Sequence, residues 1–409
     1  MNLLLLFDHR FLRARNGEIF SSKAYPYSFF KSRYLKVFDH ISILSRVAES
    51  VCTESPTDGT EGDGVTVIAL PDWRGALGYI KHRQLVVKTA LREACKPSAV
   101  IMIAPGGIGS LAFDKLRQQG YPVALEVVGS PWDAFQPGAV RHPLRPILQR
   151  WLTSTLRRQC SQACAVSYVT KEFLQRQFPT SSFFVGVSDV ALPQESFVSQ
   201  PRILFSSSTP KTVVSVAMMN GYKGHDLMVD AIRICKEMDF YFKFVMVGDG
   251  PLRKEIERRA GEQGVLDRIR FAGQLLSGSA IRSELDGADL FILPSLQEGM
   301  PRALLEAMAR SLPCIASRIG GLPEVLNSEF LIPSGDAKAL AMKMQSVLSD
   351  PAKLSEMSLQ NLTRAHDFEE STLSEKRQEY YQQVRTMTER HMLSRLSLAS
   401  PPDNVVYRN

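Results

Sequence analysis

The stretch LFILPSLQEGMPRALLEAMA, residues Leu290 to Ala309, predicts a strand, a loop and a helix in succession. Its first four residues form a short apolar run that suits a buried parallel strand, and Pro294 closes that run. Pro301 lies where a first helical residue tolerates proline, so we expect the helix to begin there and to end near Ser311.

The start of this helix is a candidate site for an anion. The backbone amides of four residues would lie at its N-terminus: Gly299, Met300, Arg302 and Ala303. Unpaired N–H groups and the positive end of the helix dipole favour an anionic or oxygen-rich ligand. Glu298 from the loop and Glu306 from the second helical turn would frame this site, where both carboxylates could accept hydrogen bonds from sugar hydroxyls.

Two glutamates separated by seven residues, in the context EGMPRALLEAMA, resemble the motif of the retaining GT-B glycosyltransferases of group 1, also known as family 4. The resemblance implies a nucleotide-diphosphate sugar as donor, with Glu298 on the donor sugar and Glu306 on the ribose hydroxyls. It also implies two Rossmann-like, doubly wound α/β domains that face each other across a cleft. An alternative that needs no ligand is that Glu306 pairs with Arg302 and Arg310, each four residues away on the helix surface.

The length of 409 residues is too great for one ordinary core, and two domains of about 200 residues each are expected. Strand signals alternate with helix signals in both halves, which predicts parallel, doubly wound sheets. A Ser- and Pro-rich stretch, residues 187–211, shows no clear period. We therefore predict an acceptor-side domain at residues 1–204 and a nucleotide-sugar-binding domain at residues 205–370, followed at 371–409 by a helix that crosses back and a tail.

Composition indicates a globular protein, with 44% hydrophobic and 22% charged residues and a net charge of +7. No apolar run approaches the roughly 18–20 residues that span a bilayer. The first apolar run breaks at Asp8 and has no basic lead, so we interpret it as a strand rather than a signal peptide and expect a cytoplasmic location. The six cysteines contain no CxxC pair, which indicates neither a disulfide framework nor a metal site.

Lys223 lies in a Lys-Gly-His segment after a predicted strand at residues 212–218 and before a predicted helix at residues 225–237. By resemblance its ammonium contacts the donor diphosphate, a task suited to a flexible point charge. The family has an arginine about five residues earlier, where this chain has Met218 and Met219. We hypothesise that Arg302 supplies the missing cation.

Two glycine segments complete the predicted donor site. Gly248 and Gly250 follow a predicted strand at residues 243–247, and Pro251 is expected to begin the next helix. The segment at Gly273 and Leu275 matches the region that contacts the base in the family, largely through its backbone. Its side chains do not reveal which base is bound.

The acceptor side is less well defined by the sequence. Gly107 lies in a Gly-rich turn after a predicted strand at residues 99–104, and Trp132 and Asp133 follow another predicted strand at residues 123–128. Such positions lie at the carboxyl ends of parallel strands, where these sheets bind ligands. Many family members have a histidine near Trp132, and this chain has none there.

A basic segment, residues 142–163, is predicted to be a helix because six apolar residues recur at helical spacing: Leu144, Ile147, Leu148, Trp151, Leu152 and Leu156. One interpretation is a core-facing helix with solvated arginines. The other is an amphipathic face that contacts anionic lipid headgroups, which would suit a lipid-linked acceptor and a position at the inner face of the membrane. Nucleic acid is not expected as a partner, since no binding module is recognisable.

The resulting expectation is a retaining hexosyltransferase of polysaccharide or glycoconjugate biosynthesis that requires neither metal nor cofactor. The resemblance implies that the leaving diphosphate itself helps to deprotonate the acceptor hydroxyl, with no covalent protein nucleophile. A nucleotide-sugar epimerase of the same fold is the alternative within enzymes. A degenerate sugar-nucleotide-binding protein without turnover is the alternative outside them.

Overall fold

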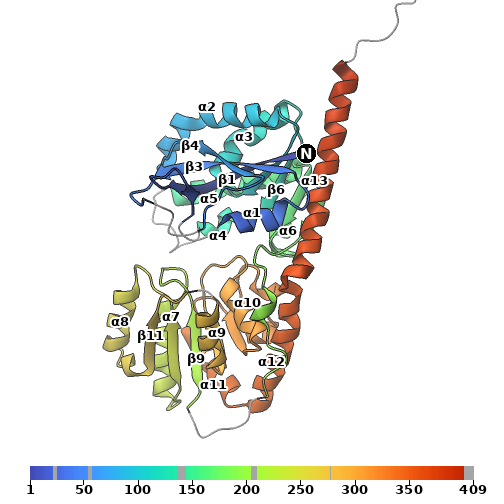
Figure 1. Cartoon of the computed structure of the whole chain (residues 1–409). Helices are drawn as coiled ribbons and strands as arrows, with labels where there is room; N and C mark the ends of the chain where they lie inside the picture. The colour runs from blue at the N-terminus through green and yellow to red at the C-terminus, as the bar shows by residue number, and fades with distance from the viewer. Residues whose placement is uncertain (22–24, 54–57, 136–143, 204–209, 277, 400–409) are drawn as a thin grey trace, which may run out of the picture.

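The computed structural model describes residues 1–21, 25–53, 58–135, 144–203, 210–276 and 278–399. The chain forms two α/β halves that lie one above the other, joined along one side by a long C-terminal helix (Figure 1). The predicted fold class, α/β with two parallel-sheet domains, is confirmed.

The first half contains an eight-stranded sheet in the order β4-β3-β1-β5-β6-β7-β8, with the short β2 paired antiparallel to β1. The other pairs are parallel. Its strands are β1 (Asn2–Arg13), β2 (Ile19–Phe20), β3 (His40–Glu49), β4 (Val65–Leu70), β5 (Ser98–Ala104), β6 (Val123–Val127), β7 (Ala165–Tyr168) and β8 (Phe183–Gly186). Its helices are α1 (Tyr27–Tyr34), α2 (Gly75–Ala94), α3 (Gly107–Gln118), α4 (Pro131–Ala134), α5 (Arg145–Gln162) and α6 (Phe173–Gln177).

The second half contains a six-stranded parallel sheet in the order β11-β10-β9-β12-β13-β14. Its strands are β9 (Thr212–Val216), β10 (Lys243–Val247), β11 (Ile269–Gly273), β12 (Leu290–Leu293), β13 (Cys314–Ser317) and β14 (Leu331–Ile332). Its main helices are α7 (His225–Glu237), α8 (Arg253–Glu262), α9 (Ser279–Asp286), α10 (Arg302–Ala309), α11 (Ala337–Leu348) and α12 (Pro351–Ala365). The strand order reverses between β9 and β12, and sheets of this kind bind ligands in the crevice outside the strand ends at such a point.

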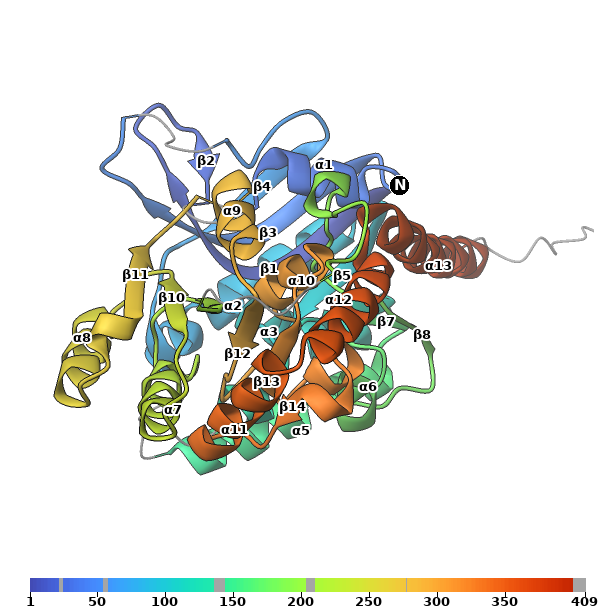
Figure 2. The same cartoon turned by 90° about the horizontal axis from the view of Figure 1, so that it is seen from below.

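The chain crosses between the halves twice. After β8, Val187, Val190 and Leu192 pack into the core of the second half, while the predicted boundary after residue 204 falls outside the described residues. At the other end, α13 (Glu370–Ala399) leaves the second half and buries Tyr380, Tyr381 and Val384 against the first sheet. Figure 2 shows the same helix running past the edge of that sheet.

Several predicted boundaries need correction. Pro301 is not the first helical residue: it is the extended N-cap of α10, with φ −79° and ψ 112°. In α8 the helix begins at Arg253, two residues after Pro251. The final helix that was expected to cross back, α13, extends to Ala399. Among the described helices, none is long and apolar enough to cross a membrane.

Candidate donor site between the two halves

The centre of the candidate site is an ion pair between Lys223, which follows β9, and Glu298, which follows β12. The Lys223 Nζ atom lies 2.5 Å from Glu298 Oε1, and the Ser295 hydroxyl donates to the same oxygen at 2.7 Å. The Glu298 side chain is only 7% exposed and that of Lys223 19%. The switch point of the second sheet therefore holds a mostly buried cation and a carboxylate fixed by two donors.

Gly224 brings these two loops together. Its φ of +70° lies in the left-handed region, and a Cβ added there would be 2.1 Å from the Pro294 carbonyl oxygen. A side chain would therefore both strain the backbone and separate the β9 loop from the β12 loop. This close approach explains locally why Lys223 can reach Glu298.

A cavity of about 380 Å³ opens directly onto the pair. Tyr222, Lys223, Glu298 and Gly299 line it from the second half, and Ala134 of α4 lines it from the first half. Its volume is within the range of roughly 300–1,000 Å³ that small-molecule sites occupy. The site is thus shared by both sheets, as a cleft between domains requires.

Glu306 lies in the second turn of α10, and its side chain is mostly buried. Burial raises its pKa, and the Arg302 guanidinium opposes that shift at a separation of 3.8 Å. The ligand-free alternative is therefore half correct: Glu306 does lie beside Arg302, but Arg310 pairs with Asp286 at 2.7 Å instead. Arg302 is open to solvent and lines a second, larger cavity, so its predicted role on the diphosphate stays a hypothesis.

The two glycines after β10 pack against backbone. A Cβ at Gly248, whose φ is +127°, would be 2.1 Å from the Ala217 carbonyl oxygen. A Cβ at Gly250 would be 2.4 Å from the Met219 carbonyl oxygen. These glycines hold the loop after β10 against the loop after β9, and this packing accounts for them without a ligand.

Gly273 and Leu275 lie at the end of β11 next to that loop. The Gly248 amide donates to the Gly273 carbonyl at 2.8 Å, and Leu275 is half-buried against the core of the second half. Met300 and Gly299 lie immediately before α10, where the Gly299 carbonyl accepts from the Gly321 amide at 3.3 Å. The predicted donor-side residues therefore all lie at the carboxyl edge of one sheet.

The predicted acceptor-side residues do not gather in one place. The Gly107 amide donates to Asp8 at 2.6 Å, and a Cβ at Gly107 would be 2.3 Å from the Tyr79 ring, so protein groups fill the turn after β5. Trp132 is 42% exposed on α4, facing the α5 side, and its carbonyl accepts from the Gln149 side chain. Asp133 is half-buried, which raises its pKa.

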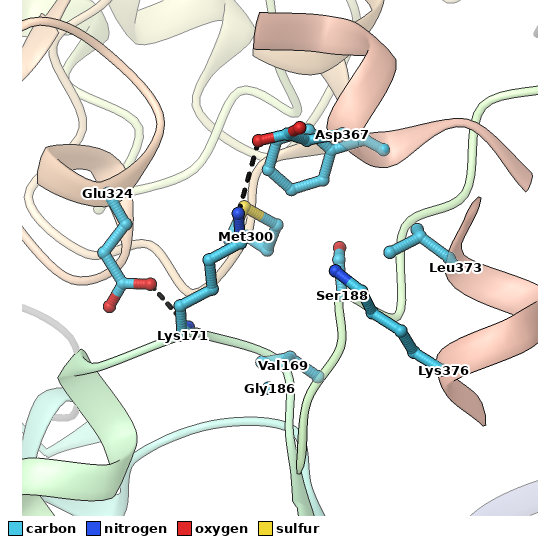
Figure 3. A pocket seen from close by; sticks show the side chains of 10 residues that line it. Val169, Lys171, Gly186, Ser188, Met300, Glu324, Asp367, Leu373 and Lys376 are labelled. Atoms are coloured by element: carbon cyan, nitrogen blue, oxygen red, sulfur yellow. Dashed lines mark hydrogen bonds and ion pairs between the residues drawn. The ribbon is translucent and has the colours of Figure 1, made fainter. Parts of the chain in front are cut away.

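The halves also touch through Glu324, at the junction drawn in Figure 3. Its carboxylate accepts hydrogen bonds from the backbone amides of Lys171, Glu172 and Phe173 at 2.5, 3.1 and 2.5 Å. Nearby, the Lys171 ammonium lies 3.2 Å from Asp367. No local sequence pattern around Glu324 pointed to a contact with the first half.

The structure also shows functional candidates that the sequence reasoning missed. Ser295, the hydroxyl on Glu298, lies in the quoted stretch, and its spacing of three residues from Glu298 was an available signal. Asp189 lies on the crossover between the halves and gave no signal. Within the described ranges, no group of three or more His, Cys, Asp or Glu residues is arranged to hold a metal ion.

Comparison with known proteins agrees with this geometry. A family model described as glycosyl transferases group 1 matches residues 198–363. Protein CapJ of Staphylococcus aureus is 26% identical over 348 residues, which cover 84% of this chain and 86% of that protein. The amylovoran biosynthesis glycosyltransferase AmsK of Erwinia amylovora is 36% identical over 141 residues, about a third of each chain (32% and 34%).

A similar solved structure is that of Anabaena Alr3699/HepE in complex with UDP. It superposes with a TM-score of 0.61 at 14% identity and covers 97% of this chain and 100% of that one. This likeness shows the same two-domain fold.

Proposed function

Because residues 198–363 belong to the glycosyl transferases group 1 family and the whole chain has the GT-B fold, we propose that this glycosyltransferase transfers a sugar from a nucleotide-diphosphate donor to a saccharide or lipid-linked acceptor, with retention of configuration. The observation that carries the proposal is the Lys223–Glu298 pair at the switch point of the second sheet, next to a cavity that both halves line. Similarity to an amylovoran biosynthesis glycosyltransferase supports a role in polysaccharide biosynthesis.

In this mechanism the donor diphosphate replaces Glu298 as the ion-pair partner of Lys223. The Glu298 carboxylate then accepts hydrogen bonds from the hydroxyls of the donor sugar. The N-terminal amides of α10 add positive potential beside the leaving group. Glu306 accepts from the ribose hydroxyls. No protein nucleophile is needed, because the leaving diphosphate accepts the acceptor proton, and the protein acts by positioning and by charge stabilisation.

Neither a metal nor an organic cofactor is part of the proposal. Lys223 and the α10 amides supply the positive charge that a divalent cation provides in other phosphate sites. Addition of a chelator at millimolar concentration should therefore leave the transfer rate unchanged.

The first experiment is a thermal-shift screen against UDP-, GDP-, ADP- and dTDP-sugars, beginning with UDP because a protein of the same fold is complexed with it. A donor at 100 times its dissociation constant should stabilise the protein by about 2.7 kcal/mol. Glu306→Ala should abolish the response, whereas Glu262→Ala on the exposed face of α8 should keep it. If no nucleotide sugar shifts the wild-type protein, the donor-site proposal is wrong.

Product analysis separates the transferase from its two alternatives. A transferase releases nucleotide rapidly only when an acceptor is present to take the sugar, and NMR of the product should show the donor's anomeric configuration. An epimerase would convert the donor with no acceptor present. A degenerate binding protein would respond in the thermal screen and release no nucleotide.

A peripheral contact with an anionic membrane, at the inner face, is the second part of the proposal. On α5, Ile147 and Trp151 are 66% and 61% exposed, so the predicted core-facing stripe is wrong for the N-terminal half of this helix. Arg150 and Arg157 line a surface pocket beside them, together with the exposed Trp132 of α4. Exposed aromatic and basic side chains on one surface favour anionic interfaces.

Sedimentation with vesicles tests this contact. The protein should sediment with phosphatidylglycerol-containing vesicles at low salt and be released at high salt, and Ile147→Ser with Trp151→Ser should reduce binding. Met342→Ser with Leu359→Ser, a pair of exposed apolar residues on the second half, is the matched control. Equal sedimentation with neutral vesicles would contradict the electrostatic part of the proposal.

A further inference from the structure

A second cavity, of about 710 Å³, lies between the halves and contains none of the predicted acceptor-side residues. Tyr25 and Phe29 line it from the first half, Asp189 lines it from the crossover after β8, and Arg302 lines it from the start of α10. Its volume suits a ligand at least as large as a sugar unit.

This cavity adjoins the donor cavity. Val128 lines the larger cavity, and Gly299 lines the donor cavity. A Cβ added at Gly299 would be 3.7 Å from the Val128 carbonyl oxygen, so these two walls are in van der Waals contact. A ligand in the larger cavity is therefore within reach of the end of the donor site that faces the first half.

One wall of the cavity is aromatic and rigid. The Tyr25 ring lies 4.9 Å from that of Phe7 and 5.1 Å from that of Phe29, both edge-on. Tyr25 has a φ of +70°, a left-handed conformation that a bulky residue adopts only when its surroundings enforce it. The ring stays half-exposed to the cavity, where it presents an apolar face and a hydroxyl.

The other wall carries the carboxylate of Asp189. Asp189 makes no ion pair and no hydrogen bond with another side chain in the part of the chain that the structure describes. Its side chain is open to the cavity and to solvent, yet the surrounding walls desolvate it enough to raise its pKa, against the opposing charges of Arg33, Arg377 and Arg302.

Glu126 also lines the cavity, but its carboxylate has a structural role that can be compared with the situation of Asp189. It is buried and receives hydrogen bonds from Arg33 at 3.1 Å, Tyr34 at 3.2 Å and Tyr381 at 3.0 Å. These bonds tie α1 and α13 to β6. Asp189 has no such set of partners, so a role in holding the fold together does not explain it.

We propose that this cavity holds the acceptor as a neutral saccharide, whose ring packs on Tyr25 and Phe29 while one of its hydroxyls donates a hydrogen bond to Asp189. Arg302 lines the same cavity from the second half, between the acceptor and the donor site. The assignment rests on the proposed transferase function. It also excludes an anionic group at this point of the acceptor, because such a group would face Asp189.

The test uses the full-length protein with the nucleotide sugar found in the thermal screen and a panel of p-nitrophenyl glycosides as acceptors. Asp189→Asn keeps the shape of the side chain and removes its charge. A hydrogen bond to a charged group contributes about 1.5–3 kcal/mol, which converts to a rise in acceptor KM of roughly tenfold to a hundredfold. Donor affinity and the slow hydrolysis of donor by water should be unchanged.

A second pair of variants tests the aromatic wall. Tyr25→Leu should raise acceptor KM, and Tyr25→Phe should restore most of the affinity, since the ring is retained. Asp267→Asn, at an exposed position in the second half, is the control for loss of a carboxylate.

Three results would overturn the inference. They are an unchanged acceptor KM in Asp189→Asn, a loss of donor affinity in that variant, or a panel in which no glycoside binds or accepts sugar. If no nucleotide sugar binds the wild-type protein, the proposed function fails first and this assignment fails with it. A normal donor response with no effect of Asp189→Asn contradicts only the acceptor assignment.

Discussion

Replacing Lys223 with methionine is the sharpest test of the donor site. Methionine has a similar length and apolar stem, so the substitution removes the charge and leaves Glu298 with the Ser295 hydroxyl as its remaining partner. Breaking a buried ion pair by removing one partner costs about 3–5 kcal/mol. Lys223 is 19% exposed at the cavity wall, where water can enter, so we expect about 2–3 kcal/mol.

For a folding unit of this size, 1 kcal/mol corresponds to a shift in melting temperature of roughly 2–4 °C. Lys223→Met should therefore lower the melting temperature by about 4–12 °C. The double variant with Glu298→Gln should recover most of this loss, because the uncompensated charge is gone. The double-mutant cycle in urea then gives the coupling energy of the pair directly.

The same variant should lose function for a separate reason. Without the ammonium, the leaving diphosphate lacks its side-chain cation, and the loss of one such electrostatic contact lowers kcat by roughly 100- to 1,000-fold. Lys211→Met is the matched control. Lys211 forms a comparable, mostly buried ion pair with Asp289, with 3.3 Å between the charged atoms, and this pair does not line the cavity. That control should lose stability and keep its response to the nucleotide sugar.

Two outcomes would refute the reasoning. If the effects of Lys223→Met and Glu298→Gln on stability are additive, the 2.5 Å contact has no energetic consequence. If Lys223→Met keeps the full thermal response to the donor, the diphosphate binds elsewhere.

Three further predictions concern the remaining structure. Gly250→Ala should destabilise the protein by at least 1 kcal/mol in a urea titration, since the new Cβ would be 2.4 Å from the Met219 carbonyl oxygen; an unchanged midpoint would contradict that close approach. A thiol reagent at neutral pH should label Cys52 and Cys95 quickly in the native protein and the other four cysteines only after denaturation, because burial raises the pKa of each of those thiols. Burial lowers the pKa of His225 to about 4, whereas the unfolded chain titrates near 6.5, so the unfolded state binds more protons between these values and stability should fall as pH drops through that window. Urea titrations at pH 7 and pH 5 should show a smaller difference for His225→Asn than for the wild type.

The sequence predicted the regular elements of the second half closely. The helix expected at residues 225–237 is α7, and the strands expected at residues 243–247 and 290–293 are β10 and β12. Local patterns predict these elements: a continuous apolar run indicates a strand buried on both faces, and apolar residues at helical spacing indicate an amphipathic helix. The two prolines predicted the helix starts less exactly. Proline is compatible both with the first helical position and with the residues just before it, and Pro301 and Pro251 both lie before their helices.

The acceptor side could not be predicted in the same way. The Gly-rich turn at Gly107 looked like a ligand loop, and only the fold shows that Asp8, 99 positions earlier in the chain, takes its amide. Likewise, the sequence could not show that the apolar residues in the first half of α5 are exposed to solvent. Helical periodicity identifies an apolar face but does not say which part of a long helix packs on the sheet.

What the sequence by itself determined is therefore the fold class and the positions of Lys223, Glu298 and Glu306, because each lies within a few residues of a strand end or helix start that local chemistry fixes. Tertiary structure alone decided which distant groups meet: Glu324 with the amides of the first half, and Asp189 with Tyr25 across a shared cavity. The physical reason is that such contacts depend on how two sheets and a returning helix pack together, and this packing is set by the summed burial of both cores rather than by the residues that finally touch.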